Sequence, residues 1–428
     1  MTGEPKLAIQ GGERAVPQGM IKPWPPIDDV DREYVMASLE GENHAFGPNC
    51  QAFEEEFAEW NGNRFAITTN SGTAALHMGV AACGCGAGDE VIVPAYSWSS
   101  SATCVLQHNA LPVFVDIDFD TMNIAVDKIE DAITPKTKAI IVVHLHGLPV
   151  AMDPVLEIAR SHGLKVIEDA CQGHGARYKG RKVGTLGDCA AFSFNQNKNL
   201  PSGEGGMFVT DDEELAARAR TLWSFGETRA PYEDRDYHVY AMGWMYRNND
   251  LTAAFGRAQL TKLDGYLAQQ AANARRLADA LQDVPGLILP QVPEGFEHNW
   301  YNYVLRFDID ALKGMYQGLA DLTPRDLRKE IVDALNAEGV PNGFWQRFIL
   351  PAMTVFQAKN AYGKGCPWLC NHSGPVDYSV DQYPVAQRHC DTHTCISMAL
   401  RAPNGSEAVD RMAVGIRKVM ENLDRVVA

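Results

Sequence analysis

The chain has 428 residues, which is long for a single hydrophobic core and predicts two domains. Hydrophobic residues make up 46% and charged residues 21% of the sequence, and no apolar run is long enough to cross a bilayer. The 38 Lys and Arg residues against 54 Asp and Glu residues give a net charge of −16, which argues against binding to nucleic acids or anionic membranes.

The first segment, residues 1–25, is rich in turn formers and predicts an extended arm, either loose or packed on a partner subunit. Helices are predicted next, at residues 28–39 and 50–60. From residue 65 onward, short apolar strands alternate with helices. The strands are predicted at residues 65–69, 90–94, 113–116, 139–143, 165–168, 190–194 and 206–210, with helices at 73–82, 100–107 and 153–162. This alternation indicates an α/β fold whose sheet is mostly parallel and covered on both faces.

A long helical stretch at residues 251–281 is predicted to lead into a smaller domain. That domain is expected to hold a strand near 301–307 and helices near 324–338 and 407–422, while residues 353–395 show no regular pattern. The expected division is an N-terminal arm at 1–25, a large domain at 26–262 and a small C-terminal domain at 263–428.

Ten cysteines occur in a chain with no recognisable secretion signal, so we expect a soluble, cytoplasmic protein with reduced thiols. Four of them gather late in the chain together with three histidines. These residues are Cys366, Cys370, Cys390, Cys395, His372, His389 and His393. The cluster could be a zinc site, but its spacing matches no common zinc motif. We therefore expect buried thiols and surface imidazoles, with no metal.

Polar residues follow three of the predicted strands, at the end of a parallel sheet where ligands usually bind. The turn at residues 70–74 could hold an anion at a helix N-terminus, or could be an ordinary helix cap. Asp169 could hold a cationic group or form a structural ion pair. Lys198 lies in a polar loop before the turn at 203–206, where a lysine is usually a solvated surface charge.

Signatures of other enzyme classes are faint or missing in this sequence. The glycines at 84–88 faintly resemble a dinucleotide fingerprint, but they precede a predicted strand instead of following one, so we reject this reading. The chain contains neither a Gly-x-x-x-x-Gly-Lys-Ser/Thr loop nor a Gly-x-Ser-x-Gly elbow.

Taken together, three motifs resemble those of the DegT-type sugar aminotransferases. The motifs are Ser71-Gly72-Thr73-Ala74-Ala75-Leu76, Asp169-Ala170-Cys171-Gln172-Gly173-His174-Gly175-Ala176, and Ser193-Phe194 followed by Lys198-Asn199-Leu200 and Gly203-Glu204-Gly205-Gly206. The resemblance runs from about Trp24 to the C-terminal helix. It implies a fold-type I pyridoxal-phosphate enzyme, with a seven-stranded, mostly parallel sheet in the large domain and a smaller α/β C-terminal domain.

The resemblance also implies residue roles. Lys198 would form the imine with pyridoxal 5′-phosphate and then move a proton, and Asp169 would pair with the pyridinium nitrogen. Gln172 would bind near the phenolic oxygen, and Trp98 would stack on the ring. The phosphate would be held by Gly72, Thr73, Ala74 and Ser193.

The chain departs from the family pattern at Met245, where a Gly-x-Asn-x-Arg motif commonly reaches the phosphate of the neighbouring subunit. Asn248 or Asn249 could take that role, or the phosphate could be held differently. The family resemblance implies a homodimer, which agrees with an apolar arm around Trp24 that needs a covering surface.

Members of this family move an amino group from glutamate or glutamine to a keto-sugar or keto-cyclitol. Residues 7–12, 22–25 and 243–247 look most like the branch that acts on scyllo-inosose-type cyclitols in aminoglycoside antibiotic biosynthesis. A nucleotide-linked keto-sugar is the alternative acceptor. Two further alternatives are a dehydratase, which would replace Lys198 with His, and a non-catalytic cofactor-binding regulator, which would normally carry a basic DNA-binding segment.

Overall fold

The computed structural model describes residues 6–228, 237–371, 374 and 376–427. Its main sheet has seven strands in the order β1-β9-β8-β5-β4-β2-β3. The strands are β1 (Phe65–Thr69), β2 (Glu90–Pro94), β3 (Leu111–Val115), β4 (Thr137–Val143), β5 (Lys165–Asp169), β8 (Cys189–Ser193) and β9 (Gly206–Thr210). Only β9 is reversed, being antiparallel to both β1 and β8. The connection from β8 to β9 is too short for a crossover helix, so the predicted mostly parallel α/β sheet is confirmed with one reversed strand.

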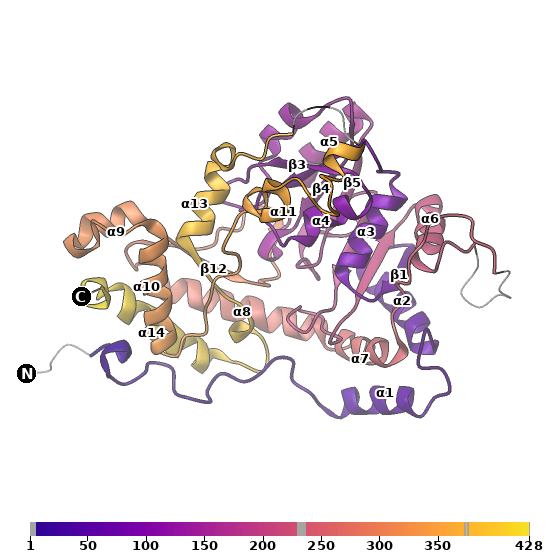
Figure 1. The fold of residues 1–428 in the computed structure, drawn as a ribbon. Helices are drawn as coiled ribbons and strands as arrows, with labels where there is room; N and C mark the ends of the chain where they lie inside the picture. Colours follow the sequence, from indigo (N-terminus) through magenta and orange to yellow (C-terminus); the bar gives the residue numbers. More distant parts are fainter. Residues whose placement is uncertain (1–5, 229–236, 372–373, 375, 428) are drawn as a thin grey trace, which may run out of the picture.

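Helices cover both faces of this sheet (Figure 1). They are α1 (Asp29–Leu39), α2 (Pro48–Asn61), α3 (Gly72–Ala82), α4 (Ser100–Gln107), α5 (Met152–His162), α6 (Glu213–Trp223) and α7 (Asp250–Leu260). On one face, Phe57 of α2 packs against Phe192 of β8. On the other, Gly79 of α3 lies so close to Cys189 of β8 that an added Cβ would be 3.4 Å from its sulfur. Because Cys189 and Phe192 alternate along one strand, the two helices cover opposite faces.

Two small sheets and the remaining helices complete the described structure. They come from the later part of the chain, apart from two short strands at residues 177–182. The first small sheet contains β10 (Leu287–Ile288), β12 (Tyr303–Phe307) and β13 (His393–Ile396), and the second β6 (Arg177–Tyr178), β7 (Arg181–Lys182) and β11 (Phe296–Glu297). The helices are α8 (Leu263–Leu281), α9 (Ile309–Met315), α10 (Pro324–Ala337), α11 (Thr354–Gln357), α12 (Trp368–Asn371), α13 (Pro384–Thr392), α14 (Ser406–Met420) and α15 (Leu423–Val426). The single helix expected at 251–281 is therefore wrong. It is broken between α7 and α8, where Lys262 forms a 2.6 Å ion pair with Asp31 of α1.

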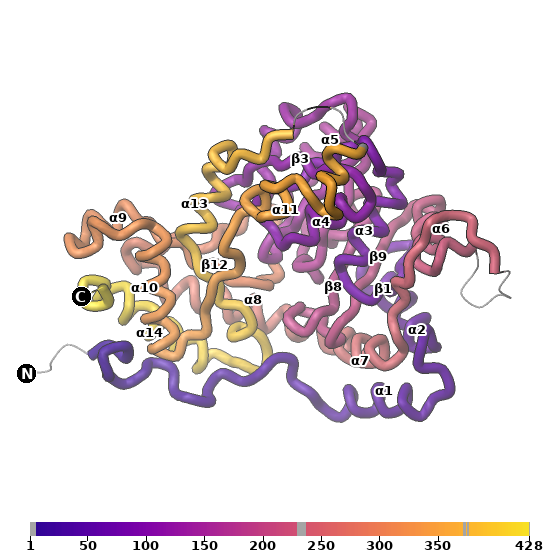
Figure 2. The backbone as a smooth tube through the Cα atoms, in the orientation of Figure 1, coloured from indigo at the N-terminus to yellow at the C-terminus, as the bar shows by residue number. Residues whose placement is uncertain are grey.

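The N-terminal arm runs along its own chain beneath α14 and α8 before it reaches α1 (Figure 2). Leu7 and Val16 are buried in a hydrophobic cluster with α10 and α14. The backbone amides of Ala8 and Ala15 donate hydrogen bonds to the Glu338 carboxylate. Trp24 is only 8% exposed. The expectation of a loose arm, or of one that needs a partner to cover Trp24, is wrong because the same chain supplies the covering surface.

The segment at 353–395 packs on the main sheet although in sequence it lies within the expected C-terminal domain. Phe356 and Tyr378 both contact the ring of Phe114 on β3. Residues of this segment belong to the same hydrophobic cluster as the seven-stranded sheet. The division of the chain at residue 262 stays a prediction.

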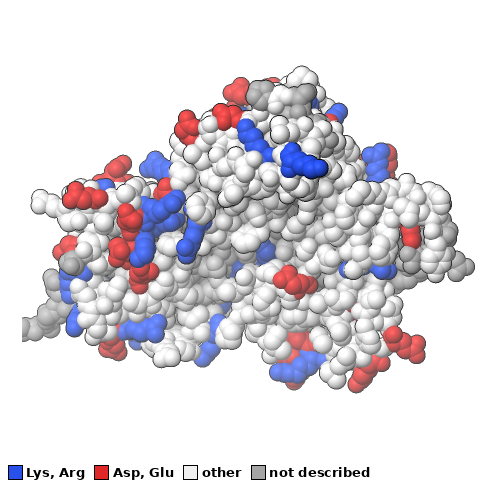
Figure 3. Space-filling view, viewed as in Figure 1, with Lys and Arg blue, Asp and Glu red and all other residues white. Residues whose placement is uncertain are grey.

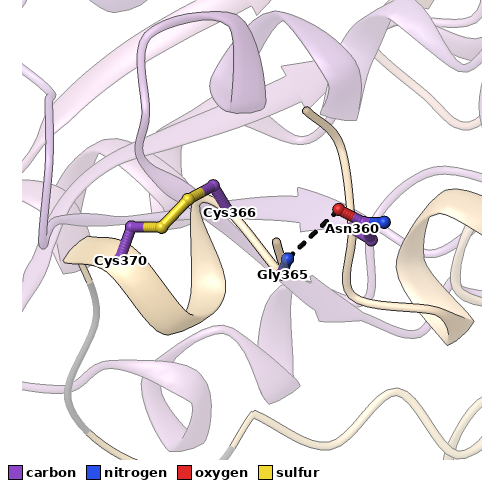
Figure 4. Close-up of a disulfide and its surroundings, with 4 residues drawn as sticks. All are labelled: Asn360, Gly365, Cys366 and Cys370. Atoms are coloured by element: carbon purple, nitrogen blue, oxygen red, sulfur yellow. Dashed lines mark hydrogen bonds between the residues drawn. A yellow bond between two sulfur atoms is a disulfide. The ribbon is translucent and has the colours of Figure 1, made fainter. Parts of the chain in front are cut away.

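A disulfide joins Cys366 and Cys370 at the start of α12 (Figure 4). The backbone amide of Gly365 donates to the side chain of Asn360 next to it. The two cysteines lie one helical turn apart with their Cα atoms separated by 5.2 Å, which is within the range that a disulfide requires. The expectation of ten reduced thiols is therefore wrong at this pair.

In the part of the chain that the structure describes, no helix has both the length and the apolar character to cross a membrane. On the face shown in Figure 3, acidic and basic side chains are interspersed and form no continuous basic patch. This distribution agrees with the net charge of −16.

Candidate active site

A cavity of about 520 Å³ opens at the carboxyl ends of the parallel strands. It is lined by Ser71, Gly72, Thr73, Leu76, Trp98, Ser100, Asp169, Cys171, Gln172, Ser193, Asn195, Asn197, Lys198, Glu204, Tyr301, Asn302, Trp345, Ser397 and Met398. Seven of the nine residues proposed from the sequence are among them. The exceptions are Ala74 and Asn248.

One end of the cavity is the N-terminus of α3. Ser71 caps this helix by accepting a hydrogen bond from the Ala74 amide at 3.1 Å, and Thr73 shares a 2.7 Å hydrogen bond with Ser100. A Cβ added to Gly72 would lie 2.7 Å from the Cβ of Ser193, so only glycine allows this approach of helix and strand. Small side chains, hydroxyls and a helix dipole meet here, which suits a phosphate. The roles of these residues toward phosphate stay predictions.

Asp169 ends β5 and is buried at the floor of the cavity. Its carboxylate accepts a 2.6 Å hydrogen bond from the Ser101 hydroxyl and a 3.2 Å bond from the Cys171 amide. Ser101 is in turn 2.7 Å from the hydroxyl of Ser97. The carboxylate is thus held in one orientation, with the cavity on its open side, as a partner for a cationic ring nitrogen requires.

Gln172 follows in the turn after β5 and is held from two sides. Its side-chain oxygen accepts a 2.7 Å hydrogen bond from the backbone of His146, and its backbone oxygen accepts one from Asn299. Because the side-chain oxygen is occupied, the amide hydrogens are the groups left for a ligand in the cavity. This geometry suits the predicted contact with a phenolic oxygen.

Lys198 projects into the cavity from the loop after β8. Its ammonium nitrogen lies 3.4 Å from the Tyr301 hydroxyl and 4.7 Å from the centre of that ring. Within the described residues it forms no ion pair with a carboxylate. Its backbone carbonyl accepts hydrogen bonds from the Trp24 indole and the Arg401 guanidinium. The loop is therefore fixed while the amine is free to react.

Aromatic side chains form the walls of the cavity. Trp98 is 54% exposed, which is unusual for tryptophan, and its ring centre lies 6.4 Å from that of Trp345. A flat ligand ring placed against Trp98 would cover apolar surface that now faces solvent.

Several residues of the site were missed from the sequence. Tyr301, Trp345 and Arg401 come from the later part of the chain, where no motif marks them. Ser101 lies in a serine-rich stretch that reads as an ordinary helix start. Only the folded chain brings these side chains next to Lys198 and Asp169.

Arg401 is fully buried behind the lysine loop. Its guanidinium donates to the carbonyls of Asn197, Lys198 and Tyr301. Burial lowers the pKa of Arg401 to about 10, so the side chain remains charged at neutral pH. This cation ties the loop that carries Lys198 to the later part of the chain.

Asn248 is buried next to α7, where its side-chain oxygen accepts from the Asn249 amide and the Thr252 hydroxyl. It does not line the cavity of its own chain. Met245 is 52% exposed. The predicted contact of Asn248 with the phosphate of a neighbouring subunit stays a prediction.

Residues 25–332 match the DegT/DnrJ/EryC1/StrS aminotransferase family. The chain belongs to this family. It is an aminotransferase that uses pyridoxal phosphate, as these enzymes do, and its acceptor is of the sugar type.

Known relatives of this aminotransferase act on different acceptors, to judge by their names. The chain is 40% identical over 369 residues to GDP-perosamine synthase of Caulobacter vibrioides, covering 85% of this chain and 95% of that one. It is 35% identical over 343 residues to the “Putative L-glutamine:3-amino-2,3-dideoxy-scyllo-inosose aminotransferase” of Micromonospora echinospora, covering 78% of each. The crystal structure of 3-amino-5-hydroxybenzoic acid synthase is similar with a TM-score of 0.81 and 28% identity, over 94% of this chain and 98% of that one.

Proposed function

We propose that this aminotransferase moves an amino group from glutamine or glutamate to a keto-cyclitol of the scyllo-inosose type, a step of aminoglycoside biosynthesis. The observation that carries the proposal is the charge of the cavity wall. Among the lining residues, Lys198 is the one cation, whereas Asp169 and Glu204 are acidic. A nucleotide-linked sugar would bring a diphosphate, which proteins usually bind with several Arg or Lys side chains. An uncharged, hydroxylated ring needs none.

The residues of the cavity fit pyridoxal phosphate. Gly72 provides an approach that a Cβ would block, Gln172 offers amide hydrogens, and Asp169 offers an oriented carboxylate. When bound, the cofactor supplies an electron sink that lets a Cα–H bond of the amino donor break. Asp169 would keep the ring nitrogen protonated. The Lys198 amine would take up the Cα proton of the amino donor and, in the second half of the reaction, return a proton to the acceptor carbon that receives the amino group.

The acceptor would lie between Trp98 and Trp345, above Lys198. Amide, hydroxyl and carboxylate groups face this space, among them Glu204, Asn195 and Asn302. Such groups both donate and accept hydrogen bonds, as the hydroxyls of a cyclitol require.

A nucleotide-linked keto-sugar is the second candidate acceptor. It is favoured by the 40% identity to GDP-perosamine synthase over most of both chains. A second cavity, of about 350 Å³, adjoins the first through Trp345, Ser397 and Met398, and Lys22 lines it. This cavity is the natural place for a nucleotide.

The experiment is a panel of scyllo-inosose, 2-deoxy-scyllo-inosose and nucleoside-diphosphate keto-sugars, each assayed with glutamine and with glutamate as donor. We expect turnover of a cyclitol, and the Lys22→Ala variant to retain it. Turnover confined to nucleotide sugars, lost in Lys22→Ala, would replace the cyclitol by the second candidate. Borohydride reduction of the cofactor-loaded enzyme followed by peptide mapping should place the label on Lys198, and a label elsewhere would contradict the proposed role of this lysine.

The family resemblance also leads us to propose a homodimer. Exposed apolar side chains lie just before and within the family's Gly-x-Asn-x-Arg position, where the resemblance places the neighbouring subunit. They are Tyr237, Val239, Tyr240, Met242 and Met245. Exposed apolar groups at this density usually mark an interface. Light scattering should give twice the mass of the chain, and Met242→Glu should lower the measured mass toward that of a monomer.

A further inference from the structure

A cluster of imidazoles and one thiol lies behind the active site and takes no part in the proposed reaction. His146 comes from the turn after β4, and His393 and Cys395 come from β13. All three side chains are buried, as is His389, whose ring stacks on that of His393 at 4.1 Å. The turn after β4 follows a strand of the main sheet, whereas β13 is a strand of a small sheet. The cluster therefore joins two parts of the fold.

The cluster has the donor set of a transition-metal site. His146, His393 and Cys395 each offer one ligand atom, and these atoms lie within 4.8 Å of one another. Ligands of a tetrahedral zinc ion lie about 3.3–3.8 Å apart, as follows from bond lengths of about 2.0–2.3 Å. A contraction of about 1 Å would therefore complete the geometry.

The hydrogen bonds of the two histidines orient them for this role. The Nδ1 atom of His393 is bonded to the backbone carbonyl of His389, which leaves Nε2 as the nitrogen for a ligand. The Nδ1 atom of His146 lies 3.0 Å from the Asn302 amide, and its Nε2 atom is buried without any hydrogen-bond partner. In the structure the Asn302 amide donates to Nδ1 through Nδ2, and its oxygen accepts a 2.8 Å hydrogen bond from the Ser397 hydroxyl. Metal binding at Nε2 of His146 would therefore require the Asn302 amide to turn over, so that its oxygen accepts the proton from Nδ1. Metal-binding histidines typically have their second ring nitrogen held by such a group.

The chemistry of the three donors indicates which ion would fit. All three side chains are buried, so an ion bound here would lie away from bulk solvent. Cys395 would bind as a thiolate and release its proton when the ion enters. One sulfur and two imidazole ligands favour a zinc-type ion over a hard ion such as Mg²⁺.

An ion could reach this position. Cys395 lines the second cavity, the one of about 350 Å³ that also contains Trp345. The ring of Trp345 lies 4.9 Å from that of His146 and also forms part of the active-site wall. The hydroxyl of Tyr96 lies 3.1 Å from Nε2 of His393, so an ion bound to this nitrogen would replace that hydrogen bond.

We propose that His146, His393 and Cys395 bind a zinc-type divalent ion, which fastens β13 to the turn after β4. The ion would stabilise the fold behind the cavity and would take no part in the reaction. The sequence spacing argued against a metal because the third ligand comes from a distant part of the chain.

The test is metal binding by the full-length enzyme after exposure to a chelator. Co²⁺ is added without reductant, so that the Cys366–Cys370 disulfide stays closed. We expect one equivalent to bind with the intense absorption of a tetrahedral cobalt–thiolate centre, and Zn²⁺ to displace it. Cys395→Ser should remove the thiolate band, and His393→Gln should weaken binding about 100-fold or more. The matched control is Cys390→Ser, a buried cysteine whose sulfur is bonded to the Gln346 carbonyl.

Failure of the wild-type enzyme to take up one equivalent of either ion would overturn the proposal. So would uptake that is equal in wild type and Cys395→Ser. If Cys395→Ser does not fold by circular dichroism, the wild-type cobalt spectrum and His393→Gln decide. These readouts do not depend on the acceptor, so they succeed or fail independently of the proposed function.

Discussion

The cofactor cavity and the histidine–cysteine cluster are neighbours that differ in how their polar groups are satisfied. In the cavity, Asp169 and Gln172 are bonded on one side and open to a ligand on the other. In the cluster, ring nitrogens of His146 and His389 are buried with no hydrogen-bond partner in the described structure. A cavity can leave polar groups open because ligand or water completes them, whereas buried groups without partners cost stability unless something else binds them.

The comparison predicts that changes in the cavity remove activity and that changes behind it remove stability. The largest effect is expected for Lys198→Ala, since this amine is proposed both to hold the cofactor and to move the proton. We expect transamination to fall by at least about 1,000-fold with little change in melting temperature. The measurement is the initial rate with the best donor and acceptor. The control is Lys182→Ala, which changes a partly buried lysine outside the cavity, and equal losses in both variants would contradict the role of Lys198.

Arg401→Met tests a residue that belongs to both kinds of region, because Arg401 is buried and also holds the loop that carries Lys198. The variant keeps the apolar stem and removes hydrogen bonds to three carbonyls, of which that of Lys198 retains the Trp24 indole as a donor. We expect the free energy of unfolding in urea to fall by about 2–4 kcal/mol. Arg276→Met, which breaks an exposed ion pair with Asp410, should change stability little. A stable Arg401→Met protein would show that the loop is held by other contacts.

His174 tests whether a buried imidazole without partners destabilises the fold where no second ligand is at hand. Burial, with lesser effects from Lys198 and Arg401, lowers the pKa of His174 to about 3, below the value of about 6.5 in an unfolded chain. The unfolded chain therefore binds the extra proton first, and stability is lost as the pH falls from about 6.5 toward 3.

Each such group contributes about 1.4 kcal/mol per pH unit in this window. His174→Phe keeps a ring against Phe192 and should reduce the loss between pH 6.5 and 5 by about 2 kcal/mol. Urea unfolding at the two pH values measures it. Parallel pH profiles for wild type and variant would show that His174 does not contribute.

The smallest effect concerns the orientation of Asp169. Ser101→Ala removes the 2.6 Å hydrogen bond to the carboxylate, and we expect kcat to fall about 10-fold, as for the loss of one hydrogen bond to a charged group. Ser97→Ala touches only Ser101 and should cost about 2-fold or less. A larger loss in Ser97→Ala than in Ser101→Ala would contradict the idea that the direct bond orients Asp169.

Much of this structure was predictable from the sequence because it depends on local patterns. Apolar strands alternating with helices predicted the α/β sheet, and polar residues after those strands predicted that Lys198, Asp169 and Thr73 would meet at one edge. Neighbouring parallel strands bring their carboxyl ends together whatever the rest of the chain does. The break between α7 and α8 was missed because the local pattern continues through it. In the folded chain, Lys262 at the break pairs with Asp31, which is far away in sequence.

By itself the sequence determined the sheet, the edge at which the cavity opens and the lysine proposed to carry the chemistry there, since repeating hydrophobic patterns and strand-end residues are local properties. Only the tertiary structure decided which distant side chains complete the site. Tyr301 and Arg401 reach Lys198, and His146 meets Cys395, through packing of the last third of the chain onto the first two. No spacing along the chain encodes those contacts, because they arise from the surfaces that the folded elements present to one another.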